Sequence, residues 1–368
     1  MNFDATRLAN PTTRVLGAYD PGHDLPSLRA RFGDQLAELG SNEMVLGPSP
    51  RALAAIRDAS GDVLRYPDPK SGALKRALAD RFKVDTKCIA LGNGSHELLM
   101  LLAQCFADPS TSVVFSEFGF AVFPIAAAAV GAIPIRVNAF ASDHPSAPYG
   151  HDLDALAEAV RADTRLVYLA NPNNPTGTWF TDAALGRFLE HVPQSTLVVV
   201  DEAYQEFVDA EELTSAVGLL DRHPNLVVTR TFSKAYALAG LRIGYLLANA
   251  GVVDVLERLR ESFNVNSLAQ TAALAALDDD VHLKTVCEWT RSERQWLSGQ
   301  LISRGYRVLP SQTNFILIDL ADDASKLEKH LFDRGVIVRP MGGYKLGHTV
   351  RISLGTRSEN ERLLAALP

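Results

Sequence analysis

The chain has 368 residues, of which 47% are hydrophobic and 21% charged, a composition that argues for a folded globular protein and against disorder. Its formal net charge is −7, with acids and bases interspersed, which argues against nucleic acid or an anionic membrane as the main partner. Three cysteines without paired metal-type spacing, Cys88, Cys105 and Cys287, predict a reducing, cytoplasmic location and no metal site.

The first forty residues predict an extended arm that leads into one helix. Pro11, Pro21, Gly22 and Pro26 interrupt any longer element, and a helical pattern follows near 27–39. The opening residues contain no apolar stretch of signal-peptide length. We expect residues 1–40 to pack with the smaller of two domains.

Residues 41–260 predict a large α/β domain. Short apolar runs rich in Val, Leu and Ile alternate with segments long enough for crossover helices, which is typical of parallel strands covered on both faces. The runs predict a mostly parallel sheet of about seven strands, at 88–91, 112–115, 133–137, 165–170, 196–200, 226–229 and 243–248.

One uncharged segment, 118–135, is long enough to raise the question of a membrane span. Pro124, Gly131 and Pro134 interrupt it. The segment therefore predicts a buried helix, a turn at Gly131 and the strand 133–137, and we expect no membrane segment.

Residues 261–368 predict a smaller α+β domain. A long helical pattern begins near Val252, and strand-like runs follow at 314–320, 336–339 and 350–354, before a charged closing helix.

Two turns follow predicted strands of the large domain and carry polar groups. Gly92-Asn-Gly-Ser95 precedes an apolar helix, so its backbone N–H groups would face a phosphate at the positive helix end. The same residues are equally compatible with an ordinary turn and a helix-capping serine. Asn171-Pro-Asn-Asn-Pro-Thr-Gly177 makes a rigid turn whose Asn174 amide could meet a ring hydroxyl, although it could be only a turn.

Two further strands end on charged residues. The apolar run 196–200 leads to Asp201, a carboxylate that is costly to bury unless a cation pairs with it, although a helix-capping aspartate is commoner. The stretch 229–244 follows another strand and contains Lys234, a potential amine nucleophile, and Arg242, a potential phosphate ligand. The alternative is that Lys234 is a surface lysine and Arg242 a structural arginine. Together the four motifs provide what a pyridoxal 5′-phosphate site needs.

The motifs 171–177, Asp201-Glu-Ala-Tyr204 and Ser233-Lys-x₃-Leu-Ala-Gly-Leu-Arg-x-Gly244, in this order, resemble those of the fold type I aminotransferases, and the resemblance spans nearly the whole chain. Within that group the chain is most similar to the histidinol-phosphate aminotransferases. The segments that carry this closer likeness are 18–22, 41–43, 47–50, 65–68 and 350–356. It departs from the usual pattern at His96 and at Met44-Val45.

The resemblance implies roles for individual residues. Lys234 would bind the cofactor aldehyde covalently and later carry the substrate proton. Asp201 would pair with the pyridinium nitrogen, and Phe118 would stack on the ring. The phenolic oxygen would meet Asn174 and Tyr204. The phosphate would be held by Gly94, Ser95, Ser233 and Arg242, with Tyr66 reaching it from the neighbouring subunit of a homodimer.

The resemblance also implies a substrate site. Arg351 would bind an α-carboxylate and Arg339 a distal anion, with help from Tyr19, although Arg339 could instead form a rim salt bridge. His96 at a helix N-terminus should stay neutral and is expected to support the site from behind, although a lone histidine on a helix is more often structural. The implied reaction transfers an amino group between L-histidinol phosphate and 2-oxoglutarate in histidine biosynthesis.

Four other functions are alternatives to this aminotransferase activity. An aromatic amino-acid aminotransferase would share the fold and the arginines, and a phosphothreonine-type decarboxylase would share the cofactor. A ligand-sensing regulator would need a DNA-binding module, for which the segment before residue 40 has neither room nor basic charge. A nicotinamide-dependent dehydrogenase would need a Gly-x-Gly-x-x-Gly turn, and Gly92-Asn-Gly94 stops short of it.

Overall fold

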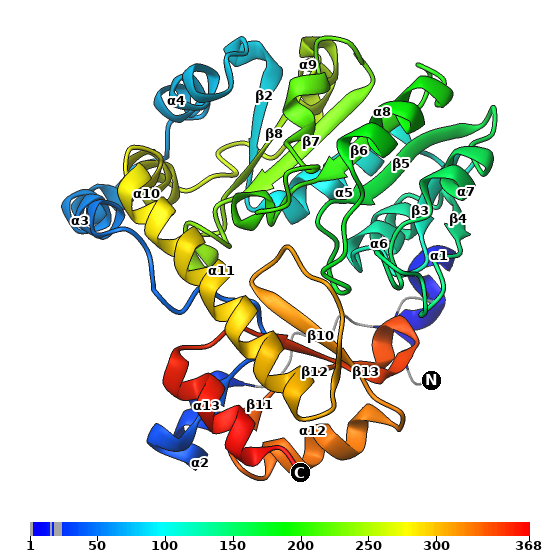
Figure 1. Ribbon diagram of the computed structural model, residues 1–368. Coiled ribbons are helices and arrows are strands. Elements are labelled where there is room, and N and C mark those ends of the chain that lie inside the picture. Colours follow the sequence, from blue (N-terminus) through cyan, green and yellow to red (C-terminus); the bar gives the residue numbers. More distant parts are fainter. Residues whose placement is uncertain (1–2, 15–16, 18–23) are drawn as a thin grey trace.

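A seven-stranded sheet forms the centre of the large domain in the computed structural model, which describes residues 3–14, 17 and 24–368. The strand order is β2-β8-β7-β6-β5-β3-β4 (Figure 1). The strands span β2 Ile89–Gly92, β3 Ser112–Ser116, β4 Ile133–Val137, β5 Thr164–Ala170, β6 Leu197–Asp201, β7 Leu226–Thr231 and β8 Gly244–Ala248. Strand β8 runs opposite to the other six strands, so the predicted mostly parallel sheet is confirmed.

The sheet is covered by helices on both faces, as its apolar strands require. Along β5, Leu166 and Tyr168 pack on one face with the helices α5 (Ser95–Phe106), α6 (Val122–Ala129) and α9 (Ala250–Leu259). Val167 and Leu169 pack on the other face with α7 (Leu153–Glu158) and α8 (Asp182–His191). The edge strand β4 differs from the prediction of burial on both faces. It pairs only with β3, and Ile133, Pro134 and Arg136 are exposed.

The helices of the large domain begin and end close to the turn residues of the sequence. Asp152, Thr181 and Asn249 cap α7, α8 and α9 through their side chains. The helices are α3 Pro50–Ala59, α4 Gly72–Phe82, α5 Ser95–Phe106, α6 Val122–Ala129, α7 Leu153–Glu158, α8 Asp182–His191 and α9 Ala250–Leu259. Short 3₁₀ turns lie at η3 Ser60–Leu64, η4 Thr86–Cys88, η5 Gln205–Phe207, η6 Ala216–Leu219 and η7 Ala239–Leu241.

The small domain is built on a four-stranded sheet of order β12-β13-β10-β9. The strands of this sheet are β9 Arg307–Val308, β10 Phe315–Asp319, β12 Arg339–Met341 and β13 Leu346–Ser353, with the turn η8 Gly342–Tyr344; strand β11 Val336–Ile337 lies outside it. The helices of this domain are α11 Asp280–Ser303, α12 Ala324–Phe332 and α13 Arg357–Ala366, whereas α10 Ser267–Leu277 precedes them and packs against the large domain. The boundary expected at residue 260 stays a prediction, and the packing of α10 against α3 and α4 favours a later boundary, within α11.

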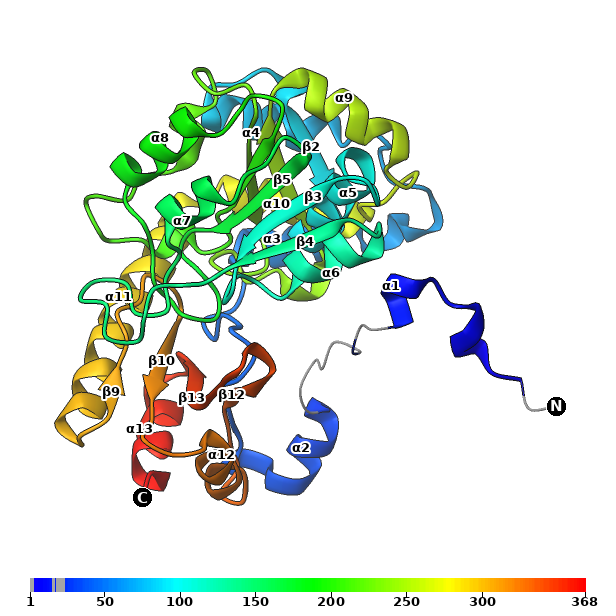
Figure 2. The same cartoon turned by 90° about the vertical axis from the view of Figure 1, so that its right-hand side faces the viewer.

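The N-terminal segment contains η1 Ala5–Leu8, α1 Pro11–Arg14, α2 Leu25–Phe32, η2 Gly33–Gln35 and β1 Ala37–Glu38. The helix predicted for 27–39 is too long. It ends at Phe32 because Gly33 takes a left-handed φ of 52°, and β1 then pairs in parallel with β11. Figure 2 shows α2 beside the small domain, whereas α1 contacts α6 of the large domain.

No helix among the described residues is both long and apolar enough to cross a membrane. The segment 118–135 instead forms α6, a turn at Gly131 with φ of 75°, and β4, as predicted.

Candidate active site

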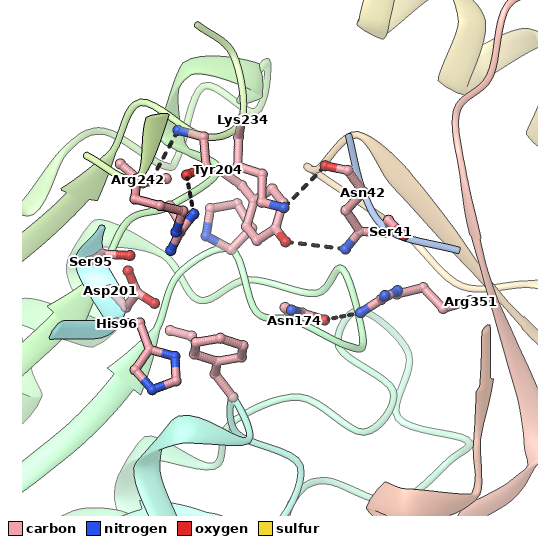
Figure 3. Close-up of a pocket in the computed structure, with 16 residues that line it drawn as sticks. Ser41, Asn42, Ser95, His96, Asn174, Asp201, Tyr204, Lys234, Arg242 and Arg351 are labelled. Carbon is pink, nitrogen blue, oxygen red and sulfur yellow. Dashed lines mark hydrogen bonds between the residues drawn. The ribbon is translucent and has the colours of Figure 1, made fainter. Parts of the chain in front are cut away.

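A cavity of about 200 Å³ lies where the carboxyl ends of β5, β6 and β7 meet the N-terminus of α5 and strand β13 of the small domain (Figure 3). Both domains contribute side chains to it. The lining residues are Ser41, Asn42, Ser95, His96, Phe120, Ala170, Pro172, Asn174, Asp201, Ala203, Tyr204, Thr231, Ser233, Lys234, Arg242 and Arg351. The four polar motifs of the sequence therefore converge on one site.

One end of the cavity suits an anion. Ser95 is the first residue of α5, and Gly94 before it has no side chain to cap the first turn. Arg242 takes a left-handed φ of 56° and lies so close to Gly94 that a Cβ there would be 2.5 Å from its Nη2 atom. Its Nη1 atom donates to Ser233 Oγ at 3.4 Å and to the carbonyl of Ala239 at 3.0 Å. This glycine, serine and arginine arrangement forms a cradle for a phosphate.

Asp201 ends β6 as a buried carboxylate, 4% exposed. Its Oδ1 atom accepts a hydrogen bond from Thr229 Oγ1 at 2.9 Å, across to the paired position on β7. Burial, with the nearby charge of Glu202, raises the pKa of Asp201 to about 7. A cation placed against this carboxylate would favour its ionised form, as a protonated ring nitrogen would.

Lys234 extends from the turn after β7 into the cavity. Its Nζ atom donates to the carbonyl of Asn42 at 3.1 Å and lies 5.7 Å from the centre of the Tyr204 ring. Burial lowers the pKa of Lys234 to about 8, and the charge of Arg351 adds to this effect. More of this amine than of an ordinary lysine is thus neutral and nucleophilic near neutral pH.

Tyr204 and Asn174 line the same cavity as this amine. Burial raises the pKa of Tyr204 to about 12, so its phenol keeps its proton, and its oxygen accepts a hydrogen bond from Asn42 Nδ2 at 3.2 Å. The Oδ1 atom of Asn174 accepts a hydrogen bond from Arg351 Nη1 at 2.6 Å.

Arg351 is buried on β13 and faces the cavity, where its Nη2 atom also donates to the carbonyl of Gly40 at 2.7 Å. Arg339 on β12 is its direct cross-strand partner, so the two side chains share a face of the sheet. Arg339 itself is not among the residues that line the cavity.

The aromatic platform predicted at Phe118 stays a prediction. Phe118 is buried, with its ring edge-on to that of Tyr149 at 5.7 Å, and Phe120 is the phenylalanine among the residues that line the cavity. Both residues lie in the turn between β3 and α6, where neither helical nor strand periodicity fixes the direction of a side chain.

Two other predicted residues lie outside this cavity. Tyr66 is 83% exposed and stacks on Phe263 at 4.6 Å. Tyr19 lies outside the described residues.

Sequence reasoning did not assign Ser41, Asn42, Phe120 and Thr231 to the site. Thr231 could have been inferred from its place at the end of β7, two residues beyond Thr229 on the same face. His96 lines the cavity directly, in contrast to its expected place behind the site. Burial and the charge of Arg242 lower the pKa of His96, in the direction expected.

The family model for class I and II aminotransferases matches residues 34–367. This chain belongs to the class I and II aminotransferases. Histidinol-phosphate aminotransferase 2 of Pseudomonas aeruginosa is 47% identical over 367 residues, which cover 99% of this chain and 98% of the relative. Histidinol-phosphate aminotransferase 2 of Pseudomonas fluorescens is 45% identical over 371 residues, which cover 100% of this chain and 98% of the relative.

A solved relative has the same aminotransferase fold. The crystal structure of histidinol-phosphate aminotransferase from Sinorhizobium meliloti, in complex with pyridoxal-5′-phosphate, superposes with a TM-score of 0.88 at 35% identity. The match covers 98% of this chain and 96% of that one. The expected fold type I architecture is thereby confirmed.

The polar groups of this aminotransferase cavity fit pyridoxal phosphate on their own chemistry. The cradle at Gly94 and Arg242 suits the phosphate, and the buried carboxylate of Asp201 suits a protonated ring nitrogen. The amine of Lys234 lines the same cavity and is the nucleophile that an aldehyde requires.

Proposed function

We propose that this aminotransferase transfers an amino group between L-histidinol phosphate and 2-oxoglutarate, in histidine biosynthesis, with pyridoxal 5′-phosphate as its cofactor. The observation that carries the proposal is one cavity that contains the amine of Lys234, the carboxylate of Asp201 and the guanidinium of Arg351. The relatives named above, similar over nearly their whole length, support the choice of substrate.

We assign the cofactor contacts by chemical type. Asp201 keeps the ring nitrogen protonated, and Asn174 and Tyr204 hold the phenolic oxygen. Phe118 is assigned to stack on the ring, and Phe120 lines the same cavity. The phosphate is held by Gly94, Ser95, Ser233 and Arg242. When bound, the cofactor supplies an aldehyde that condenses with amines and a ring that accepts electrons from the substrate Cα.

Lys234 then acts as the proton carrier of the reaction. Once the substrate amine has displaced it from the cofactor, its free amine removes the proton from the substrate Cα and later returns a proton on the cofactor side. A pKa of about 8 suits both directions, because the amine can exist in either protonation state near neutral pH.

The two arginines select the substrate. Arg351, held by Asn174 and Gly40, is presented to an α-carboxylate such as that of glutamate, and binding replaces these neutral acceptors with a charged one. Arg339, its cross-strand neighbour, is assigned to the distal anion, either a phosphate or a side-chain carboxylate. Tyr19 is assigned to the same substrate pocket.

A homodimer completes the proposed site. Val63, Leu64 and Tyr66 form an apolar group on one surface, with exposed fractions of 61%, 77% and 83%. We infer that this surface packs against a second copy and that Tyr66 reaches the cofactor phosphate of the neighbouring subunit. The three cysteines are free thiols, which supports a cytoplasmic location.

The test compares half-reactions of the cofactor-loaded protein. L-histidinol phosphate, glutamate and L-phenylalanine are added separately while the visible absorption of the cofactor is followed. We expect fast conversion with L-histidinol phosphate and glutamate, and a clear preference for phenylalanine would favour an aromatic aminotransferase instead. Release of carbon dioxide from phosphothreonine, without any response to glutamate, would favour the decarboxylase.

A variant separates the two substrate classes further. Arg339→Gln should weaken the half-reaction with L-histidinol phosphate far more than that with phenylalanine, because only the former carries a distal anion. Equal losses with both substrates would remove Arg339 from its assigned role.

A further inference from the structure

A chain of hydrogen bonds leads from the small domain to Tyr204. The backbone N–H of Asn42 donates to Ser353 Oγ at 2.8 Å, and that hydroxyl lies 2.9 Å from Asn42 Oδ1. On its other side, Asn42 Nδ2 lies 3.2 Å from the hydroxyl of Tyr204. All three side chains are buried, with Asn42 2% exposed and Ser353 and Tyr204 each 3% exposed.

The direction of each hydrogen bond in this chain follows from the first one. Because Ser353 Oγ accepts the backbone N–H of Asn42, its own hydrogen is available for an acceptor, and Asn42 Oδ1 is within reach. The opposite orientation of the amide would leave a buried serine hydrogen without an acceptor, which is costly. Asn42 therefore presents its NH₂ group to Tyr204, whose oxygen can only accept from it.

The proton of Tyr204 is thereby turned elsewhere. A phenol that accepts one hydrogen bond still has one hydrogen to donate, and accepting the first bond strengthens the second. Tyr204 lines the active-site cavity. We propose that Ser353 and Asn42 are positioning residues that direct the Tyr204 proton into the cavity, toward the phenolic oxygen of the cofactor. This inference depends on the proposed cofactor site.

The backbone of Asn42 has a second task in the same place. Its φ is 54°, a left-handed conformation that asparagine tolerates better than most residues. Its carbonyl accepts hydrogen bonds from Lys234 Nζ and from Asn314 Nδ2, each at 3.1 Å. One residue thus holds the amine that carries the proton and orients the phenol beside it.

The test replaces the NH₂ group of Asn42, a hydrogen-bond donor, by a carboxylate oxygen, an acceptor of nearly the same shape. In Asn42→Asp the carboxylate would still accept from Ser353, but it would also accept from Tyr204 and draw the phenol proton away from the cavity. The readout is a pH titration of the visible absorption band of the bound cofactor. The apparent pKa of this band should rise by about one unit or more, because the phenolic oxygen loses a donor that stabilises its anion.

A second background removes the effect of the added charge. In Tyr204→Phe no phenol proton remains to be redirected, so Asn42→Asp should there shift the apparent pKa of the band much less than in the otherwise wild-type protein. Equal shifts in the two backgrounds, or no shift in either, would overturn the proposal. Asn42→Gly keeps the left-handed backbone without adding charge, and it leaves the Tyr204 proton free, so only a small shift is expected.

Ser353→Ala keeps the inference testable if Asn42→Asp does not fold. It frees the amide of Asn42 to rotate, and a smaller upward shift that vanishes with Tyr204→Phe is expected; an unchanged band would count against the proposal. A wild-type protein that binds no cofactor would instead refute the proposed function. The two failures are therefore distinguishable.

Discussion

Gly94 is the position at which a single methyl group should separate cofactor binding from folding. Its φ of 87° and ψ of 161° lie in a region that only glycine occupies readily. A Cβ there would also stand 2.5 Å from Nη2 of Arg242, well inside contact distance. Gly94→Ala should therefore both strain the turn before α5 and displace the arginine.

The expected size of the effect follows from the strain of this backbone conformation. Holding alanine in this conformation costs on the order of 1–3 kcal/mol. If the turn relaxes without cofactor and must be restored on binding, the cofactor dissociation constant should rise by about 5- to 150-fold. If it cannot relax, the same energy should appear as lost stability.

The assay titrates the cofactor-free protein with pyridoxal phosphate by visible absorbance and measures unfolding in urea in parallel. Gly240→Ala is the matched control, because it lies in the same stretch as Arg242 and a Cβ there would meet nothing within 4 Å. Binding by Gly94→Ala within about twofold of wild type, with unchanged stability, would refute the reasoning. Equal losses in both variants would show that the stretch tolerates no change at all.

Three further outcomes follow from the charges of the site. Burial raises the pKa of Asp201 to about 7, so its neutral form stabilises the cofactor-free protein at low pH. The free energy of unfolding should fall as the pH rises to about 7, by up to about 4 kcal/mol. Asp201→Asn should flatten this part of the pH dependence of urea unfolding, and an unaltered profile would count against the raised pKa. The rate at which Lys234 traps an aldehyde should reach half its maximum near pH 8. Borohydride reduction and peptide mapping measure this rate, and a midpoint near the pKa of a free lysine would contradict the lowered pKa of Lys234. Arg351→Lys should raise the KM for glutamate about tenfold or more because one ammonium cannot replace two guanidinium contacts, whereas an unchanged KM would place the carboxylate elsewhere.

Much of the fold could be predicted from local patterns. The seven strands of the large domain lie within two residues of their expected limits, because apolar β-branched runs between turn residues are local signals. The helix expected up to Leu39 was too long, because pairing of Ala37 with Val336, some three hundred residues away, is invisible to a local pattern.

The site divides in the same way. Asn174, Asp201 and Lys234 follow strands β5, β6 and β7, and parallel neighbouring strands bring their carboxyl ends to one edge, so their convergence was predictable. The sequence could not show that Phe120 lines the cavity, because the turn between β3 and α6 is irregular. The position of His96 at the cavity wall depends on how α5 is rotated against the sheet.

By itself, the sequence determined which chemical groups this protein carries and at which strand ends they lie, because strand and turn formation depend mainly on neighbouring residues. Only the tertiary structure decided how those groups are oriented and linked. Asn42 shows the difference most clearly: its hydrogen bonds to Tyr204 and Ser353 join residues 162 and 311 positions apart. Such contacts form only when the two domains pack together. The direction in which the Tyr204 proton points depends on all the hydrogen-bond partners that this packing brings around it.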